Sequence, residues 1–299
     1  MTRRGWLLFI ALGVIWGIPY LLIKVAVRDL TPASLVLLRT ALGAAILLPV
    51  VARRGNARAL LARWRPIASF TVVEMAIPWL LLSHAERRVT SSLAGLFMAS
   101  VPLVGALLSR VTGRHEPLGG RRLVGLVVGL AGVIALLGLD LGRGDAVAIV
   151  ELAIVALGYA IGPMIISRRL SDLPVLDVVA ASLALCAIGY APVGIAQLPR
   201  AMPGLDVVGA VAVLGIVCTS VAFLLFFRLI AEVGPVRATV ITYVNPAVAV
   251  AAGVVLLGEP FTSGTGVGFV LILAGSWLAT GIASAGAGPR EAREPVPSK

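Results

Sequence analysis

Three ionisable side chains lie inside long apolar runs of this sequence, where they are placed to do chemistry. Arg39, Glu74 and Glu151 each interrupt a run that is otherwise mostly apolar. Such a charge costs about 2.5–3.5 kcal/mol at the centre of a membrane and usually faces the interior of the protein. We therefore expect a buried charge network of these three residues, with Arg39 and Glu151 at matching depths for a salt bridge. Two roles stay open for Glu74: it binds a cationic group or a proton, or it forms a static ion pair with Arg39.

A second set of candidates is aromatic or polar and is expected near the middle of the same runs. Asn245 precedes Pro246, and proline lacks the N–H that would bond the carbonyl one turn earlier. A helix that bends there exposes a carbonyl beside a carboxamide, as in many sites inside membranes. Pro102 and Pro246 are therefore predicted to break helices, with a purely structural kink as the alternative. The candidate substrate-binding residues, together with Glu74, are Trp16, Tyr20, Trp79, Tyr159, Ser220, Phe223, Tyr243 and Asn245.

The apolar runs themselves indicate the fold class. Of the 299 residues, 59% are hydrophobic and only 13% are charged, whereas about a quarter of a soluble domain is charged. A helix needs about 20 apolar residues to cross a bilayer. We therefore predict an all-α integral membrane protein with ten transmembrane helices. The predicted spans are 6–23, 33–52, 66–85, 89–109, 123–139, 146–167, 178–199, 207–227, 238–258 and 265–284.

The net charge of +11 does not indicate a nucleic-acid-binding protein. The basic residues form short clusters between apolar runs, rather than a stripe along one helix face. Basic residues beside transmembrane helices favour the cytoplasmic side. Placing the N-terminus in the cytoplasm puts about three times as many of them on that side as on the other. The sequence therefore predicts a multi-pass protein of a bacterial inner membrane with both termini in the cytoplasm.

Two parts of the chain match each other after a shift of 143 residues (116 to 259). Glu116-Pro117 falls on Glu259-Pro260, and Leu130-Ala131-Gly132 falls on Leu273-Ala274-Gly275. A repeat of five helices is odd, so its second copy enters the membrane from the opposite face, as in many transporters that alternate between two states. A duplication with purely structural meaning is the alternative. The predicted units are five-helix repeats at 1–140 and 141–284 and a disordered cytoplasmic tail at 285–299.

Several motifs resemble those of a known family. They are Trp16-Gly17 in the first predicted helix, Arg39 in the second, Pro102 in the fourth, and the LLGEP sequence of Leu256–Pro260 that closes the ninth. Together they resemble the drug/metabolite transporter superfamily and, within it, the ten-helix EamA-type transporters. The resemblance covers residues 6–284 and implies a basket of ten helices around a central cavity that exports or imports amino acids or other small metabolites. Leu157-Gly158-Tyr159 departs from the family, which often carries a Trp-Ala pair there.

These features predict a secondary transporter that moves a small metabolite, such as an amino acid, by alternating access. Export is the expected direction, and proton coupling is left open. The sequence has no phosphate-binding loop and no cluster of nucleophiles or metal ligands, so we expect neither a cofactor nor a metal site nor an enzyme. A lipid-linked-sugar flippase of the same fold and a membrane-embedded enzyme are the alternatives. The expected partners are the lipid bilayer and a small-molecule substrate, with protons and a second copy of the chain left open.

Overall fold

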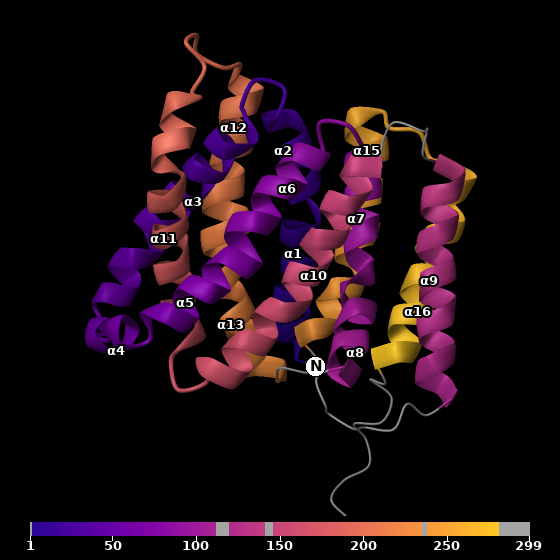
Figure 1. The fold of residues 1–299 in the computed structure, drawn as a ribbon, viewed down its shortest axis with the longest axis horizontal. Helices are drawn as coiled ribbons and strands as arrows, with labels where there is room; N and C mark the ends of the chain where they lie inside the picture. The colour runs from indigo at the N-terminus through magenta and orange to yellow at the C-terminus, as the bar shows by residue number, and fades with distance from the viewer. Residues whose placement is uncertain (1, 112–119, 141–145, 235–237, 281–299) are drawn as a thin grey trace, which may run out of the picture.

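The computed structural model describes residues 2–111, 120–140, 146–234 and 238–280 (Figure 1). Within these ranges the chain is helical and contains no strand, which confirms the predicted all-α class for this part of the protein. The predicted tail at 285–299 lies outside the described residues. The helices are α1 (Arg3–Gly17), α2 (Pro19–Ala26), α3 (Pro32–Ala52), α4 (Ala57–Ala62), α5 (Trp64–Phe70), α6 (Ile77–Ala85), α7 (Ser91–Phe97), α8 (Val101–Val111), α9 (Gly120–Asp140), α10 (Ala146–Arg169), α11 (Val175–Ala196), α12 (Leu205–Gly215), α13 (Ala222–Val233), α15 (Asn245–Leu257) and α16 (Ser263–Thr280).

Four short helical turns of other types join some of these helices into longer rods. Two are π-helical, η1 (Thr71–Ala76) between α5 and α6 and η3 (Ile216–Val221) between α12 and α13. Two are 3₁₀-helical, η2 (Met98–Ser100) before α8 and η4 (Thr239–Tyr243) before α15. A π-helical turn inside an α-helix frequently marks a functional site.

Seven of the resulting helical segments are long and apolar enough to cross a membrane. Three shorter apolar stretches, at 123–136, 241–257 and 263–278, coincide with the remaining predicted spans. The chain is therefore rich in apolar helices throughout, whereas the arrangement of ten crossings stays a prediction. The seven long segments are 3–26, 32–52, 64–85, 91–108, 146–169, 175–196 and 205–233.

Proline residues mark the places where several of these segments are interrupted. Pro19 is the first residue of α2, directly after Ile18 ends α1. Pro102 is the second residue of α8 and follows η2, and Pro246 is the second residue of α15 and follows η4. Residues in the first turn of a helix do not donate a backbone hydrogen bond within that helix, so the missing N–H of proline costs no bond there. The structure therefore places Pro102 and Pro246 at new helix starts after a tighter turn.

The closest helix pair is formed by α9 and α16, which stand together at one edge of the bundle (Figure 1). A Cβ atom on Gly275 would overlap the backbone of Gly129, and one on Gly132 would lie 2.7 Å from the backbone nitrogen of Ile272. The residue numbers rise along one helix as they fall along the other, so the two helices are antiparallel. Small residues let helix backbones approach closely, which supplies much of the packing energy between helices in lipid.

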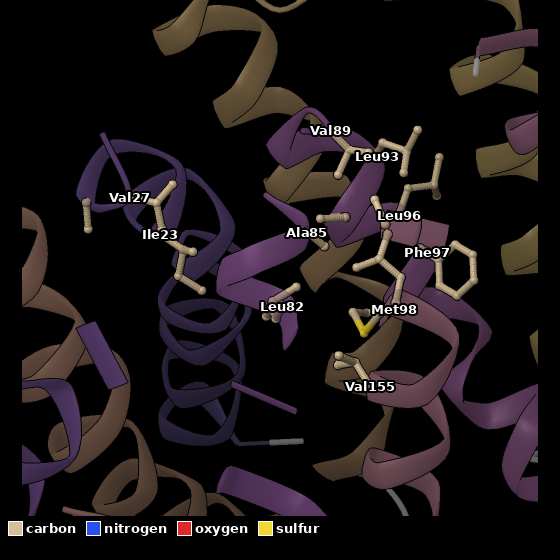
Figure 2. Packing of buried hydrophobic residues seen from close by; sticks show 14 of the residues in the cluster. Ile23, Val27, Leu82, Ala85, Val89, Leu93, Leu96, Phe97, Met98 and Val155 are labelled. Carbon is tan, nitrogen blue, oxygen red and sulfur yellow. The ribbon is translucent and has the colours of Figure 1, made fainter. Parts of the chain in front are cut away.

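Apolar side chains cover the outside of the bundle as well as its core. On α9, Val127, Leu130 and Ile134 are each about 60% exposed, as expected for a surface that faces hydrocarbon. Inside, the largest buried apolar cluster joins α2, α6, α7, α10 and α12, and Figure 2 shows part of it around Ala85 and Val89. The end of the bundle where α2, α6 and α15 finish and α7 begins is at the top of Figure 1 and is called the upper end below.

The tight α9–α16 contact generates a test of the fold. We expect Gly275→Ala to lower the thermal stability of the purified protein, because its Cβ would meet the backbone of Gly129 and overpacking costs about 1–3 kcal/mol. Gly209→Ala is the matched control, since a methyl group added to that helical glycine would meet no other atom within 4 Å. Equal melting temperatures for the two variants would contradict the close packing of α9 on α16.

Candidate functional site

Arg39 on α3 is buried although it carries a charge; only 8% of the residue is exposed. Its guanidinium carbon lies 3.8 Å from the centre of the Trp79 ring on α6. Its Nε donates a hydrogen bond of 3.1 Å to the hydroxyl oxygen of Thr219. A cation is attracted to the face of an indole, and the attraction strengthens when water is excluded. An aromatic ring and a hydroxyl group therefore hold this charge, and no carboxylate of the described residues forms an ion pair with it.

Thr219 accepts this hydrogen bond from within the π-helical turn η3. Its hydroxyl donates to the carbonyl of Leu214 at 2.8 Å, and the hydroxyl of Ser220 donates in the same way to Gly215 at 3.1 Å. A threonine hydroxyl has one hydrogen and two lone pairs. Because the hydrogen is used within the helix, an acceptor remains for Arg39. Ser220, a predicted binding residue, is fully buried and bonds to the backbone of its own helix.

Glu74 lies on the other π-helical turn, η1, and faces Gly162 on α10. A Cβ atom at Gly162 would overlap the Oε2 atom of Glu74. That oxygen is buried and has no hydrogen-bond partner among the described residues, and none of the described ion pairs includes Glu74. A buried polar atom without a partner is costly and needs a specific explanation. Oε2 of Glu74 is therefore a buried acceptor that the described part of the chain leaves without a donor.

Tyr159 on α10 is within electrostatic reach of both of these side chains. It interacts electrostatically with Arg39 and Glu74, and its hydroxyl group meets the indole of Trp79. Tyr20 on α2 interacts in the same way with Tyr159 and Arg39. These contacts gather side chains from both ends of the sequence into one polar group in the interior. We call this group the central cluster: Tyr20, Arg39, Glu74, Trp79, Tyr159 and Thr219.

The remaining predicted aromatic pair lies between α1 and α13. The rings of Trp16 and Phe223 are 5.9 Å apart and edge-on, and Trp16 also packs against Phe226 at 4.9 Å. Phe223 in turn packs against the buried apolar cluster that contains Trp79. Phe223 therefore connects this aromatic group to the side of the central cluster.

Tyr243 and Asn245 bond to neighbouring helices. The hydroxyl of Tyr243 donates to the carbonyl of Ser276 on α16 at 3.2 Å. With its amide nitrogen turned toward them, Asn245 donates to the carbonyls of Gly13 on α1, at 3.3 Å, and of Ile241, at 3.1 Å. These bonds tie the turn before α15 to α1 and α16, which agrees with the structural alternative for the proline kink.

Glu151 joins a different set of partners from those predicted. Its two carboxylate oxygens lie 2.6 Å from Nδ1 of His84 and 2.7 Å from the guanidinium of Arg88. Both partners lie at or just beyond the end of α6, which packs against α10. The predicted salt bridge between Arg39 and Glu151 is therefore not present, and neither is an ion pair between Arg39 and Glu74. Glu151 belongs to the upper end, whereas Arg39 and Glu74 belong to the central cluster.

Comparison with known proteins gives this arrangement a family. The EamA-like transporter family matches residues 3–138 and, a second time, residues 146–281. The chain belongs to this family. It is 30% identical over 259 residues to the "Uncharacterized inner membrane transporter YedA" of Escherichia coli strain K12, which covers 83% of this chain and 81% of that protein. It is 24% identical over 279 residues to an "Uncharacterized transporter" of Archaeoglobus fulgidus, covering 92% of this chain and 98% of that one.

A solved crystal structure has a similar fold. It matches with a TM-score of 0.65 and 22% sequence identity, over 94% of this chain and 98% of its own. At this identity the likeness shows the fold alone. The family and the names of its members indicate a membrane transporter rather than an enzyme. Among the described residues of this EamA-like chain, no group of three or more His, Cys, Asp and Glu side chains could hold a metal ion.

Sequence reasoning did not identify one group of charges at the upper end of this EamA-like protein. The ammonium group of Lys24 on α2 donates to the backbone carbonyls of Glu86 and Val89, at 2.6 and 2.7 Å. Glu259, after α15, accepts from the backbone N–H groups of Ser91 and Ser92 at the start of α7, at 2.7 and 2.9 Å. The repeated Glu-Pro motif singled out Glu259, but no sequence signal indicated its partners.

The contact at the start of α7 determines the protonation of Glu259. Partial burial alone would raise the pKa of Glu259, but hydrogen bonds from Ser92 and Ser91 outweigh this effect and hold the pKa below its ordinary value. Backbone N–H groups at a helix N-terminus favour a negative charge. Glu259 is therefore ionised at neutral pH and joins the loop after α15 to α7.

This contact predicts a pH-dependent contribution to stability. The stabilisation from an ionised Glu259 is fully present above the ordinary glutamate pKa and is lost as the pH falls through its lowered value. We expect Glu259→Gln to melt at a lower temperature than the parent at neutral pH, because its free energy of unfolding falls by on the order of 1 kcal/mol. The difference between the two melting temperatures should close in acid. The control is Glu232→Gln on the exposed surface. A gap that persists unchanged in acid would disprove the assignment.

The partners of Glu151 predict a specific energetic coupling. In a double-mutant cycle, Glu151→Gln and Arg88→Gln should show an interaction energy between about 0.5 and 3 kcal/mol, because the two groups share a partly buried ion pair. Arg87→Gln is the matched control, since Arg87 bonds instead to the carbonyl of Leu30. Its effect should add to that of Glu151→Gln. Thermal unfolding of the four proteins in each cycle measures both values, and coupling to Arg87 rather than Arg88 would refute the pairing.

Proposed function

We propose that this protein is a secondary transporter that moves a small zwitterionic metabolite, such as an amino acid, by alternating access. The observation that carries the proposal is that the guanidinium group of Arg39 and the carboxyl group of Glu74 both lie in the central cluster and do not pair with each other. The guanidinium of Arg39 has no carboxylate partner among the described residues, and Oε2 of Glu74 has no donor there. A substrate with both a carboxylate and an ammonium group would satisfy both.

The chemistry of the two groups fits these substrate charges. A guanidinium group presents a planar set of donors that matches a carboxylate, while its flat face stacks on an aromatic side chain. Here the stacking is on Trp79 and the Nε bond is to Thr219, so the position of Arg39 is set before a substrate arrives. Glu74 would accept from the ammonium group, and Tyr159 lies within electrostatic reach of both. Buried charges inside membranes commonly mark substrate pathways.

Two observations support an inverted repeat of five helices, with units at 1–140 and 141–284. The family matches the chain twice, and both the first and the last residues of the matches are 143 positions apart. The contacts of α9 with α16 follow the same shift. Gly129 contacts Gly275, and Gly132 contacts Ile272. Adding 143 to the α9 residue of the first contact and subtracting 143 from its α16 residue gives the second contact. Antiparallel contact between equivalent helices is what inverted copies produce. Such repeats place a substrate site near the midplane and open it alternately to each side.

The distribution of basic residues supports the orientation. With both termini in the cytoplasm, the upper end faces outward and the loops with fewer basic residues lie there. The protein would then move its substrate across a bacterial inner membrane, and export is the direction we propose. The chain carries no ATP-binding motif, so an ion or substrate gradient would drive transport. A lipid-linked-sugar flippase would need several cations for a phosphate, whereas Arg39 alone supplies one in the central cluster.

Transport in proteoliposomes tests the proposal directly. A labelled panel of amino acids, cationic amines, organic acids and lipid-linked sugars would be offered with and without a pH gradient. We expect saturable movement of a zwitterion, at least tenfold slower in Arg39→Gln and in Glu74→Gln because each loses one of the two charges. Movement of lipid-linked sugars alone would replace the proposal with a flippase, and movement of none of the panel would reject it.

Gly162 allows the role of Glu74 to be tested without removing its charge. A methyl group at Gly162 would displace the carboxyl group of Glu74. Gly162→Ala should therefore weaken the apparent affinity for a zwitterion by about tenfold or more. The reason is that a lost charge-assisted hydrogen bond costs about 1.5–3 kcal/mol. Gly189→Ala is the control, because no atom lies within 4 Å of the added position. The measurement is the substrate concentration at half-maximal transport rate. Equal values for both variants would remove Glu74 from the substrate site.

A further inference from the structure

Glu86 is the most deeply buried carboxyl group at the upper end among the described residues. It directly follows α6 in the turn that leads to α7, and 0% of it is exposed. Neither of its side-chain oxygens has a hydrogen-bond partner among the described residues. Its sequence neighbours Ala85 and Val89 belong to the large apolar cluster drawn in Figure 2. An ionised carboxylate in such surroundings would lose its hydration without replacement, which is strongly unfavourable.

Several charged groups act on Glu86, and the titratable side chains Tyr20 and Tyr159 also interact with it electrostatically. Lys24 on α2 interacts electrostatically with Glu86, but its ammonium group donates its hydrogen bonds to the backbone carbonyls of Glu86 and Val89. Glu259, on the loop after α15, and Arg39 on α3 also act on Glu86 electrostatically. Arg28 acts on Lys24 rather than on Glu86. The side chains of three nearby residues have other partners. Arg87 donates to the carbonyl of Leu30, and Arg88 and His84 contact the carboxylate of Glu151.

A count of charges shows why one proton is needed. Lys24 supplies one positive charge and interacts electrostatically with two carboxyl groups, Glu86 and Glu259. Glu259 is kept ionised by the helix N-terminus that it caps. Burial raises the pKa of Glu86 well above its ordinary value, and the negative charge of Glu259 adds to this effect while Lys24 opposes it. The arrangement is therefore neutral when Lys24 and Glu259 are charged and Glu86 holds a proton.

We propose that Glu86 is a proton-binding site whose occupancy controls the closure of the upper end. With the proton bound, Lys24 holds the turn between α6 and α7 to α2, and Glu259 holds α7 to the loop after α15. When the proton leaves to water, the new carboxylate attracts the ammonium group of Lys24 away from the two carbonyls and repels Glu259 from the start of α7. Both contacts weaken together, and the upper end is released. This inference rests on the proposed transport function only for its role in coupling.

Infrared spectroscopy of the purified protein tests the site without any substrate. A protonated carboxyl group absorbs as a carboxylic acid, separately from a carboxylate. We expect part of the carboxylic-acid band at pH 7 to be missing in Glu86→Gln and to be intact in the exposed control Glu232→Gln. Glu86→Asp, which retains a carboxyl group, should restore a band at a shifted frequency and covers the case in which the glutamine variant folds poorly. A band that is unchanged in Glu86→Gln would overturn the proposal.

Removing Lys24 tests the control by charge. Because Lys24 favours the ionised form of Glu86, Lys24→Met should move the titration of this band upward by at least about one pH unit. Arg28→Met is the matched control and should move it little, since Arg28 acts on Lys24 rather than on Glu86. A downward shift or no shift in Lys24→Met would contradict the proposed arrangement.

Transport measurements separate the proton site from the transport function. In proteoliposomes, Glu86→Gln should retain exchange of labelled for unlabelled substrate. The increase in its transport rate caused by a pH gradient should be at least tenfold smaller than in the parent. Stimulation equal to that of the parent would overturn the coupling role. If the parent protein transports none of the panel while the band at pH 7 is still lost in Glu86→Gln, the transport proposal fails and the proton site stands.

Discussion

The need to hold a charged guanidinium group inside an apolar protein constrains the centre of this structure. Arg39 cannot be hydrated there, and no carboxylate of the described residues neutralises it. The protein instead supplies the face of Trp79 and the hydroxyl of Thr219. Each of these two side chains can reach Arg39 only if the helix that carries it is rotated to face Arg39. Three elements, α3, α6 and the η3 turn, therefore have a common reason for their positions around this side chain.

The two π-helical turns give the long helices a feature that a regular α-helix lacks. In η3, the hydroxyls of Thr219 and Ser220 bond to carbonyls that lie five residues earlier. In η1, Glu74 faces the glycine of a neighbouring helix, and the carbonyl of Ala76 accepts from the hydroxyl of Tyr190 on α11 at 2.9 Å. Local departures from the regular ladder expose backbone and side-chain groups that a polar site can use. Both turns lie beside the central cluster.

The upper end is joined by contacts of a different kind from those in the interior. There, full charges meet backbone groups: Lys24 meets two carbonyls and Glu259 meets two N–H groups at the start of α7. Backbone groups at helix ends are left without partners by the helix itself, so side chains from other helices can bind them. Glu86 lies among these contacts without a partner of its own among the described residues. This end is therefore sensitive to protonation, whereas the α9–α16 contact depends on the close fit of glycines.

The sequence by itself determined the helical class, the membrane setting and the family resemblance. Long apolar runs can satisfy their backbone groups in lipid only as helices or closed barrels, and this is a local property that can be read along the chain. It also identified Arg39 and Glu74 as candidate site residues, while the repeated Glu-Pro motif that contains Glu259 indicated only the repeat. The number of crossings, the inverted arrangement of the repeats and the direction of transport stay predictions.

Only the tertiary structure decided which groups meet. Equal depth suggested that Arg39 pairs with Glu151, but depth along a helix does not determine which neighbour it has or which way a side chain points. Because α10 packs on α6, Glu151 meets Arg88 and His84 instead. In the same way, the sequence Glu86-Arg87-Arg88 is typical of a polar turn and does not indicate that Glu86 is buried. In the structure it is completely buried, and Lys24 from α2 bonds to the same turn. Such long-range contacts leave no mark on local composition.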